Sequence, residues 1–220
     1  MTANASGRAN RVAPDGSTHA VADRGQCWGN RGLLLNAHGE PVRHFRGRNW
    51  IICRLEFKGR RRTQWRPGRL TELYFLDEPT ALAAGHRPCG ECRYHDYHRF
   101  QQAWAAAHPD GPARAADIDR RLHADRIGAD GARAHVAALA SLPDGALVEH
   151  EQAFWLVRGR FLHPWSFGGY GPGHARSGFL DAVTVRTPRA TVATLRAGYQ
   201  PAYHPSANLS AGSAAVKETR

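Results

Sequence analysis

The tight cysteine pair in Cys89-Gly90-Glu91-Cys92 constrains this chain more than any other feature of its sequence. The pair follows Gly85, which is suited to end a helix, and Pro88, which cannot continue one. Two thiols at this spacing can hold a metal, carry out redox chemistry or fill a core. A redox pair normally opens a helix that follows a strand, whereas this pair follows a helix and a proline. The context therefore favours a metal site.

Zinc prefers four ligands in a tetrahedron, and the chain offers two further cysteines, Cys27 and Cys53. We therefore expect one Zn²⁺ bound by all the cysteines of the chain, which are Cys27, Cys53, Cys89 and Cys92. His95 and His98 follow Cys92 at helical spacing, so a histidine could replace Cys27 as the fourth ligand. A redox pair and unliganded thiols remain the alternatives.

Composition sets the class of protein. The chain has 220 residues, of which 42% are hydrophobic, enough for a globular core in one domain or two small ones. It shows no apolar run long enough to span a membrane and no secretory leader, so we expect a cytoplasmic protein without a membrane partner. A reducing compartment keeps cysteines as thiols. The formal net charge of +11 indicates a polyanionic partner.

The pattern of elements predicts an α+β fold. We expect strands over 49–57 and 71–77, then a helix capped by Asp77 with Pro79 in its first turn and Gly85 at its end. An apolar run and a turn at His38-Gly39 complete a β-meander. Further helices are expected from Cys92 onward, over 115–127 and over 131–142, and short antiparallel strands over 146–150, 153–159, 160–165 and 182–186.

These elements predict four regions. Residues 1–24 and 206–220 read as disordered tails, because they lack hydrophobic periodicity. Residues 25–111 would form a small basic domain of β-meander and helix stabilised by zinc. Residues 112–205 would form a second α+β half of short helices and antiparallel strands, whose role the sequence leaves open.

The segments "NWIICRLEF" and "ELYFLDEPTALAAGHRPCGECR" together resemble the zinc-binding N-terminal domain of the Ada DNA alkylation-repair proteins. The resemblance covers about residues 49–93, and its Ala-x-x-Ala-Gly-x-Arg-Pro-Cys-x-x-Cys part is fairly specific. It implies that Cys89 and Cys92 are the second zinc pair of that family. It also implies that Cys53 is the zinc thiolate that accepts a methyl group from a DNA phosphotriester.

The chain departs from the family at one ligand. The family's first pair is Cys-x-x-x-Cys, and the residue four beyond Cys53 is Phe57. Either Cys27 takes the missing position or the site is incomplete. The chain also lacks the Pro-Cys-His-Arg motif of the alkyltransferase domain, and residues from about 112 onward match no family that we can name.

Basic residues gather in one segment. Residues 25–70 hold eleven Lys and Arg against two acidic residues, and arginines there alternate with Phe45, Trp50, Phe57 and Trp65. Guanidinium groups pair with phosphates and aromatic rings stack on exposed bases, so we expect contact with nucleic acid, and with DNA rather than RNA. The expected contact residues are Arg43, Arg46, Arg48, Lys58, Arg60, Arg61, Arg62, Trp65 and Arg66.

Three functions fit these observations. The first is a zinc-binding protein that contacts the DNA phosphate backbone, related to DNA repair, with Cys53 as a reactive thiolate. The second is an enzyme, a hydrolase or nuclease, with an active site in 150–205 and a purely structural zinc; its candidate residues are His163, Ser166, His204 and Ser206. The third is a protein-interaction module whose charge serves solubility.

Overall fold

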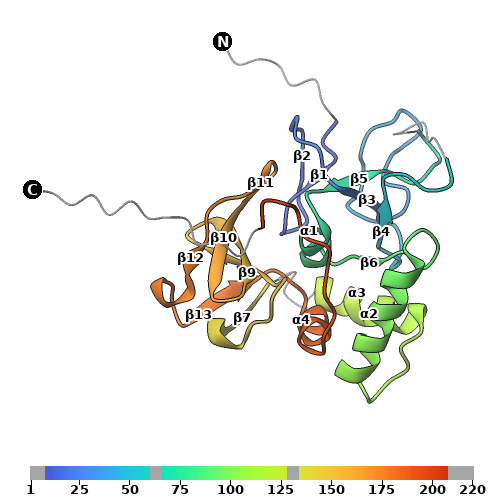
Figure 1. Ribbon diagram of the computed structural model, residues 1–220. Coiled ribbons are helices and arrows are strands. Elements are labelled where there is room, and N and C mark those ends of the chain that lie inside the picture. The colour runs from blue at the N-terminus through green and yellow to red at the C-terminus, as the bar shows by residue number, and fades with distance from the viewer. Residues whose placement is uncertain (1–7, 60–65, 128–133, 208–220) are drawn as a thin grey trace, which may run out of the picture.

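The computed structural model describes residues 8–59, 66–127 and 134–207. It has the expected α+β class, with two sheets and a group of helices between and below them (Figure 1). None of the helices in these ranges is long and apolar enough to cross a membrane.

The first sheet carries the cysteines. Its strands run in the order β2-β1-β5-β3-β4-β6. They are β1 (Arg11–Val12), β2 (Thr18–His19), β3 (Cys27–Asn30), β4 (Ile51–Arg54), β5 (Leu73–Phe75) and β6 (Arg87–Pro88). Strand β3 is antiparallel to both β4 and β5, and the short β6 runs parallel to β4.

The second sheet is antiparallel and follows the order β11-β10-β9-β8-β13-β7, with β12 beside β10. Its strands are β7 (His135–Ala138), β8 (Leu147–His150), β9 (Ala153–Arg158), β10 (Phe161–Ser166), β11 (Gly169–Tyr170), β12 (His174–Ala175) and β13 (Ala182–Val185). The strands expected over 146–150, 153–159, 160–165 and 182–186 are therefore confirmed.

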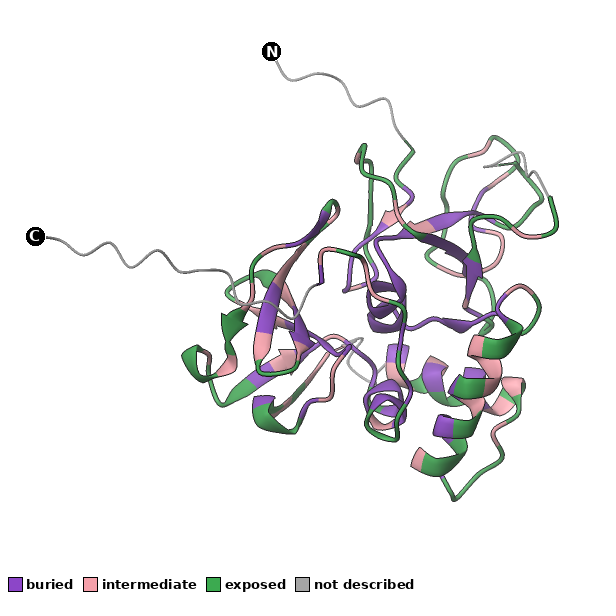
Figure 2. Cartoon of the chain, in the orientation of Figure 1, coloured by how far each residue is buried: buried purple, intermediate pink, exposed green. Residues whose placement is uncertain are grey.

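Helix α1 (Glu78–Ala83) lies between the two sheets with every residue buried, and Figure 2 shows it in the buried colour throughout. Asp77 caps it by accepting a hydrogen bond from the backbone N–H of Thr80, and Gly85 ends it with a φ of 87°, both as predicted. Leu82 packs into the core of the first sheet, whereas Ala83 packs against Leu147 and Leu156 of the second.

The remaining helices close the core. They are α2 (Tyr94–Ala107), α3 (Ala115–Arg126) and α4 (Arg189–Arg196), and the predictions for 92–107 and 115–127 are confirmed. Ile118 of α3 and Leu195 of α4 share one hydrophobic cluster with Ile52 of β4. The expected boundary at residue 111 therefore does not separate two cores, because one cluster draws side chains from both sides of it.

The predicted N-terminal tail over 1–24 is wrong for residues 8–24. Strands β1 and β2 pair with each other, β1 also pairs with β5, and Val12 is fully buried. The polar composition of residues 8–24 gave no sign of these strands. A two-residue strand needs only one buried apolar side chain when a larger sheet supplies its backbone hydrogen-bond partners. Residues 1–7 lie outside the described ranges.

Two other predictions need correction. The helix expected over 131–142 is wrong for residues 135–138, which form β7 on the edge of the second sheet, paired with β13, whereas Leu139–Ser141 form a single 3-10 turn. Pairing with a neighbouring strand overrides alanine's preference for a helix there. The tail expected over 206–220 is wrong for residues 206 and 207, because Ala207 is buried and Ser206 accepts a hydrogen bond from the backbone N–H of Tyr170. Residues 208–220 lie outside the described ranges.

Candidate metal centre

Three cysteine side chains meet at one end of the first sheet. The Sγ atoms of Cys53, Cys89 and Cys92 all lie within 4.8 Å of one another. Within 8–59, 66–127 and 134–207, no other group of three His, Cys, Asp or Glu side chains comes as close together. The structure thus brings together three of the four expected ligands.

Strand pairing explains how residues far apart in sequence reach this point. Strand β6 runs parallel to β4 with Ile52 opposite Pro88, and the backbone N–H of Cys89 donates to the carbonyl of Ile52 over 2.9 Å. The residue after each of these partners is a cysteine, so Cys53 and Cys89 lie side by side. The predicted helix stop at Pro88 therefore serves as a strand that carries the cysteine pair to the sheet.

The Cys-x-x-Cys turn is held by its own backbone. The N–H of Glu91 donates to Sγ of Cys89 over 3.4 Å, and the N–H of Arg93 donates to the carbonyl of Cys89. A backbone N–H directed at sulfur stabilises a thiolate. This turn is thus arranged for a charged sulfur.

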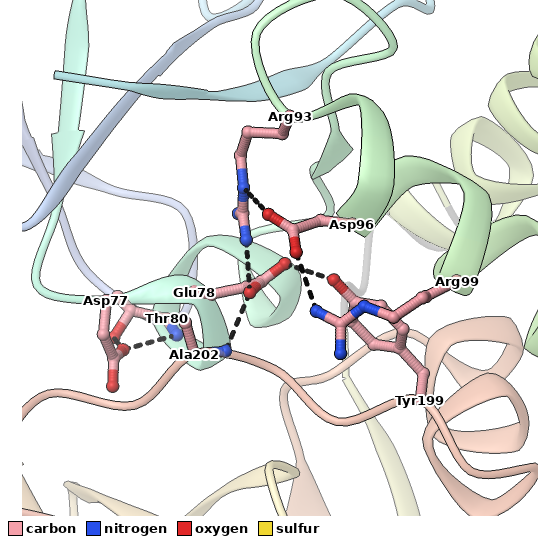
Figure 3. Close-up of polar contacts among 8 residues, drawn as sticks. All are labelled: Asp77, Glu78, Thr80, Arg93, Asp96, Arg99, Tyr199 and Ala202. Carbon is pink, nitrogen blue, oxygen red and sulfur yellow. Dashed lines mark hydrogen bonds and ion pairs between the residues drawn. The ribbon is translucent and has the colours of Figure 1, made fainter. Parts of the chain in front are cut away.

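Arg93 fixes the turn to the rest of the molecule, as Figure 3 shows. Its guanidinium bonds Glu78 over 2.7 Å and Asp96 over 2.8 Å, and the Glu78 carboxylate also accepts from the Tyr199 hydroxyl and the Ala202 N–H. Burial opposes the charge on Arg93, but the Glu78 carboxylate more than offsets it and raises the pKa of Arg93. The cysteine turn, helix α1 and the chain's last described segment are therefore joined in one network.

The three thiols affect one another's protonation through hydrogen bonds. Hydrogen bonds from Cys53 and then Cys92 hold the pKa of Cys89 well below its usual value. The bond to Cys89 in turn raises the pKa of Cys53, whose thiol keeps its proton. The cluster therefore already favours one negative sulfur, which suits a site for a cation.

The prediction that Cys27 is the fourth ligand is not supported by this geometry. Cys27 precedes Trp28 on β3, and successive side chains of a strand point to opposite faces. Trp28 lies opposite Cys53, so Cys27 points away from the cluster and packs in the main core beside residues such as Phe75. Burial raises the pKa of Cys27, as expected for a neutral core thiol.

Histidine does not complete the set either. His95 is exposed and His98 half-buried on α2, and neither joins the three sulfurs among the described residues. The ring of His98 instead packs against Tyr94, with 4.3 Å between centroids. The protein supplies three thiols, and the chemistry of this donor set fits Zn²⁺, whose Zn–S bonds of about 2.3 Å place sulfurs of a tetrahedron roughly 3.8 Å apart.

A cavity of about 380 Å³ lies directly beside these sulfurs, and all three cysteines line it. Its floor is one face of the first sheet, where Tyr74, Trp28 and Cys53 form a row across three adjacent strands. Asn30 and Ile51 form the next row. The residues of this floor other than the cysteines were missed in the sequence, although the alternation in "CWGN" places Trp28 and Asn30 on one face.

The expected nucleic-acid contacts fall on the loops beside this sheet. Arg43, Arg46, Arg48, Lys58 and Arg66 are all exposed. Arg60, Arg61, Arg62 and Trp65 lie outside the described residues. The loops that follow β3 and β4 run side by side, because the N–H of Leu34 donates to the Thr71 hydroxyl over 3.1 Å.

One expected stacking ring is unsuitable. Trp50 is fully buried, with the guanidinium groups of Arg31 and Arg126 over its ring at 4.5 Å and 4.3 Å. Phe45 packs against Trp50, whereas Phe57 lines the cavity. Of the interleaved aromatic residues that the structure describes, Phe57 alone contributes to that opening.

The residues proposed for an enzyme site in 150–205 have structural partners. His163 is buried and its Nδ1 bonds the carbonyl of Gly171, while the Ser166 hydroxyl donates to Gly169. His204 and Ser206 bond each other over 2.7 Å and tie the C-terminal segment to β11. These four residues do not form a shared metal cluster within the described ranges.

Comparisons with protein-family models, with curated proteins and with solved structures find no significant match to this chain.

Proposed function

We propose that this chain is a zinc-binding protein that contacts nucleic acid, with DNA preferred to RNA. The contact would be made by the exposed cations beside its first sheet. The observation that supports zinc is the meeting of three thiol sulfurs within 4.8 Å on a backbone-stabilised turn. Cys53, Cys89 and Cys92 would hold the ion. Bound zinc supplies a positive charge that keeps its thiolate ligands deprotonated.

The number of protein ligands favours a reactive zinc site over a purely structural one. Structural zinc sites normally use four protein ligands, whereas catalytic sites keep three and leave a position for water or substrate. Here Cys27 points away, and the three thiols line a cavity. We take the presence of three protein ligands, in place of the four of a structural zinc site, as support for a reaction at the sulfurs.

Cys53 is our candidate for that chemistry, in line with the resemblance to Ada. Its sulfur would form a bond to an electrophilic alkyl carbon, and the C–O bond of a phosphotriester would break with its electron pair going to the phosphate oxygen. The product is a thioether at Cys53, so each chain would react once. Mass spectrometry after incubation with methylated DNA tests this step, and an unmodified Cys53 peptide in zinc-loaded protein would contradict it.

Charge supports the nucleic-acid contact. Arg43, Arg46 and Arg48 are exposed on one loop, and Lys58 and Arg66 are exposed on the neighbouring loop. Cationic side chains gain affinity for phosphates by releasing counterions from the nucleic acid. Each phosphate contact therefore adds about −0.9 to the slope of log affinity against log salt concentration.

The test is fluorescence anisotropy with a labelled DNA duplex and a labelled single strand across a series of salt concentrations. We expect the combined Arg43→Gln, Arg46→Gln and Arg48→Gln variant to lower the magnitude of this slope by roughly 2 to 3. A matched variant with Arg114→Gln, Arg120→Gln and Arg160→Gln removes the same charge from exposed positions elsewhere and should keep the wild-type slope. Absence of binding at low salt would contradict the proposal.

A further inference from the structure

We propose that the cavity beside the three cysteines binds a nucleobase, with the phosphate attached to that nucleotide remaining outside on the neighbouring cations. This inference rests on the proposed contact with nucleic acid and names the part of the ligand that enters the protein.

The walls of the cavity suit a flat, largely apolar group. Trp28 and Tyr74 lie side by side on its floor, and Phe57, Leu55 and Leu70 line it from the loops. Leu55 and Leu70 are 50% and 40% exposed, which is unusual for large apolar side chains grouped around one opening. A cavity of about 380 Å³ is within the range of small-ligand sites.

Asn30 supplies a polar group without a partner. Its side chain is 4% exposed and lines the cavity, and its Oδ1 accepts from the backbone N–H of Gly32. Because that bond identifies the oxygen of the amide group, the other terminal atom is the nitrogen Nδ2. This nitrogen is buried and has no hydrogen-bond partner in the described structure. Buried donors are nearly always satisfied, so this one indicates an acceptor atom on a ligand. Every nucleobase carries such acceptors on its edge.

Charge separates the inside of the cavity from its surroundings. Glu56, Glu72 and Glu91 line it together with the three cysteines, and among the residues that the structure describes Arg54 is the one cation in that lining. Such walls favour a neutral group over an anionic phosphodiester. Outside the lining, Lys58 is exposed, with its ammonium 5.2 Å from the centre of the Phe57 ring, and Arg66 and Arg69 are also exposed. A nucleotide has the matching arrangement, with a neutral base and an anionic phosphate.

The site requires the base to leave its stack. A base within a duplex cannot reach a cavity of this kind, whereas a base in a single strand or a flipped base can. We therefore expect single strands to bind more tightly than duplexes of the same length.

The experiment compares two labelled eight-nucleotide strands of equal charge, one of mixed sequence and one abasic, with the zinc-loaded full chain. We expect the strand with bases to bind at least about tenfold more tightly, because stacking and one hydrogen bond both contribute. Asn30→Asp keeps an acceptor for Gly32 but removes the donor, and should reduce this difference by about threefold or more while the stacking contribution remains. Asn49→Ala, an exposed amide outside the cavity, should leave it unchanged.

The outcomes distinguish the two proposals. Equal affinity for both strands would overturn the base site while leaving the phosphate contact intact. If neither strand binds, the proposed contact with nucleic acid is wrong. Saturation-transfer NMR with free adenosine and thymidine then tests whether the cavity still binds a base. A nucleoside signal lost in Asn30→Asp would support a site for free nucleosides, and no signal in wild type would overturn it. Circular dichroism of each variant checks that the fold is retained.

Discussion

Cys53 lies directly opposite Trp28 in the antiparallel pair of β3 and β4. This register puts an aromatic ring beside a thiol on the face that forms the cavity, and it sends Cys27 to the other face. The chemistry of the site therefore follows from a pairing between residues 25 positions apart. A shift of one residue in this register would bring Cys27 onto the same face of the sheet as Cys53.

Metal content should separate the cysteines into two groups. We expect one zinc per chain in wild type and in Cys27→Ala, and loss of zinc in Cys53→Ser, Cys89→Ser and Cys92→Ser, because only these three sulfurs meet. Elemental analysis of the purified proteins measures this. Loss of zinc from Cys27→Ala, with the fold unchanged by circular dichroism, would show that Cys27 is a ligand after all.

The carboxylate of Glu78 should be critical for stability. Glu78→Gln leaves the buried Arg93 with less than its full countercharge, and we expect a loss of about 3 to 5 kcal/mol in the free energy of unfolding. Tyr199→Phe removes one hydrogen bond to the same carboxylate and should cost about 1 kcal/mol. Urea denaturation measures both.

The matched control for this network is Asp117→Asn. Asp117 of α3 pairs with the exposed Arg114 and Arg120, so its charge should contribute less than about 1 kcal/mol. A loss for Glu78→Gln no larger than that for Asp117→Asn would contradict the role assigned to the network.

Two glycines near the site should differ in how much stability they lose on substitution by alanine. A Cβ at Gly29 would overlap the backbone oxygen of Ile51 and contact the Phe75 ring, so Gly29→Ala should lower stability by about 2 to 3 kcal/mol or more. A Cβ at Gly90 would meet only the Tyr97 ring at an ordinary 3.6 Å, so Gly90→Ala should change stability by less than about 0.5 kcal/mol. Thermal unfolding compares them, and a similar loss in both would contradict this reading of the turn.

Stability should fall in mild acid because of buried histidine. Burial, with a further contribution from Arg121, lowers the pKa of His108, whose Nε2 bonds the carbonyl of Ala190. The folded state then binds fewer protons than the unfolded state, so this group stabilises the fold above the ordinary histidine pKa of about 6.5. That contribution is lost as the pH falls through the folded pKa.

Unfolding in urea at pH 7 and at pH 5.5 tests this expectation. His108→Gln can still donate to Ala190 and should lose less stability on acidification than wild type. The exposed His38→Gln should behave like wild type. An equal loss in wild type and in His108→Gln would show that other groups cause the pH dependence.

Local rules predicted the parts of the chain that depend on neighbours in sequence. Asp77, Pro79 and Gly85 correctly marked the buried helix, and the cysteine pair correctly marked a group of three cysteines that could hold a metal ion. Residues 135–138 were assigned to a helix wrongly, since their partner strand lies more than forty residues away and only the fold brings it close.

That Cys27 does not join the other three cysteines could not be predicted for a similar reason. Cysteine count favoured Cys27, but strand register decides which face a side chain takes, and the sequence showed no strand at 27–30. Trp28 and Asn30 were missed with it, although their spacing of two would have placed them on one face once that strand was recognised.

Synthesis from the N-terminus sets the order in which the metal ligands and the hydrogen-bond partners of Asp77 and Glu78 become available. Their partners Tyr199, Ala202 and His204 follow 121 to 127 residues later, whereas all three clustered thiols lie within the first 92 residues. A nascent chain leaves the ribosome from its N-terminus, so the thiols emerge long before the last hydrogen-bond donors of helix α1. Metal capture can therefore precede closure of the protein around that helix.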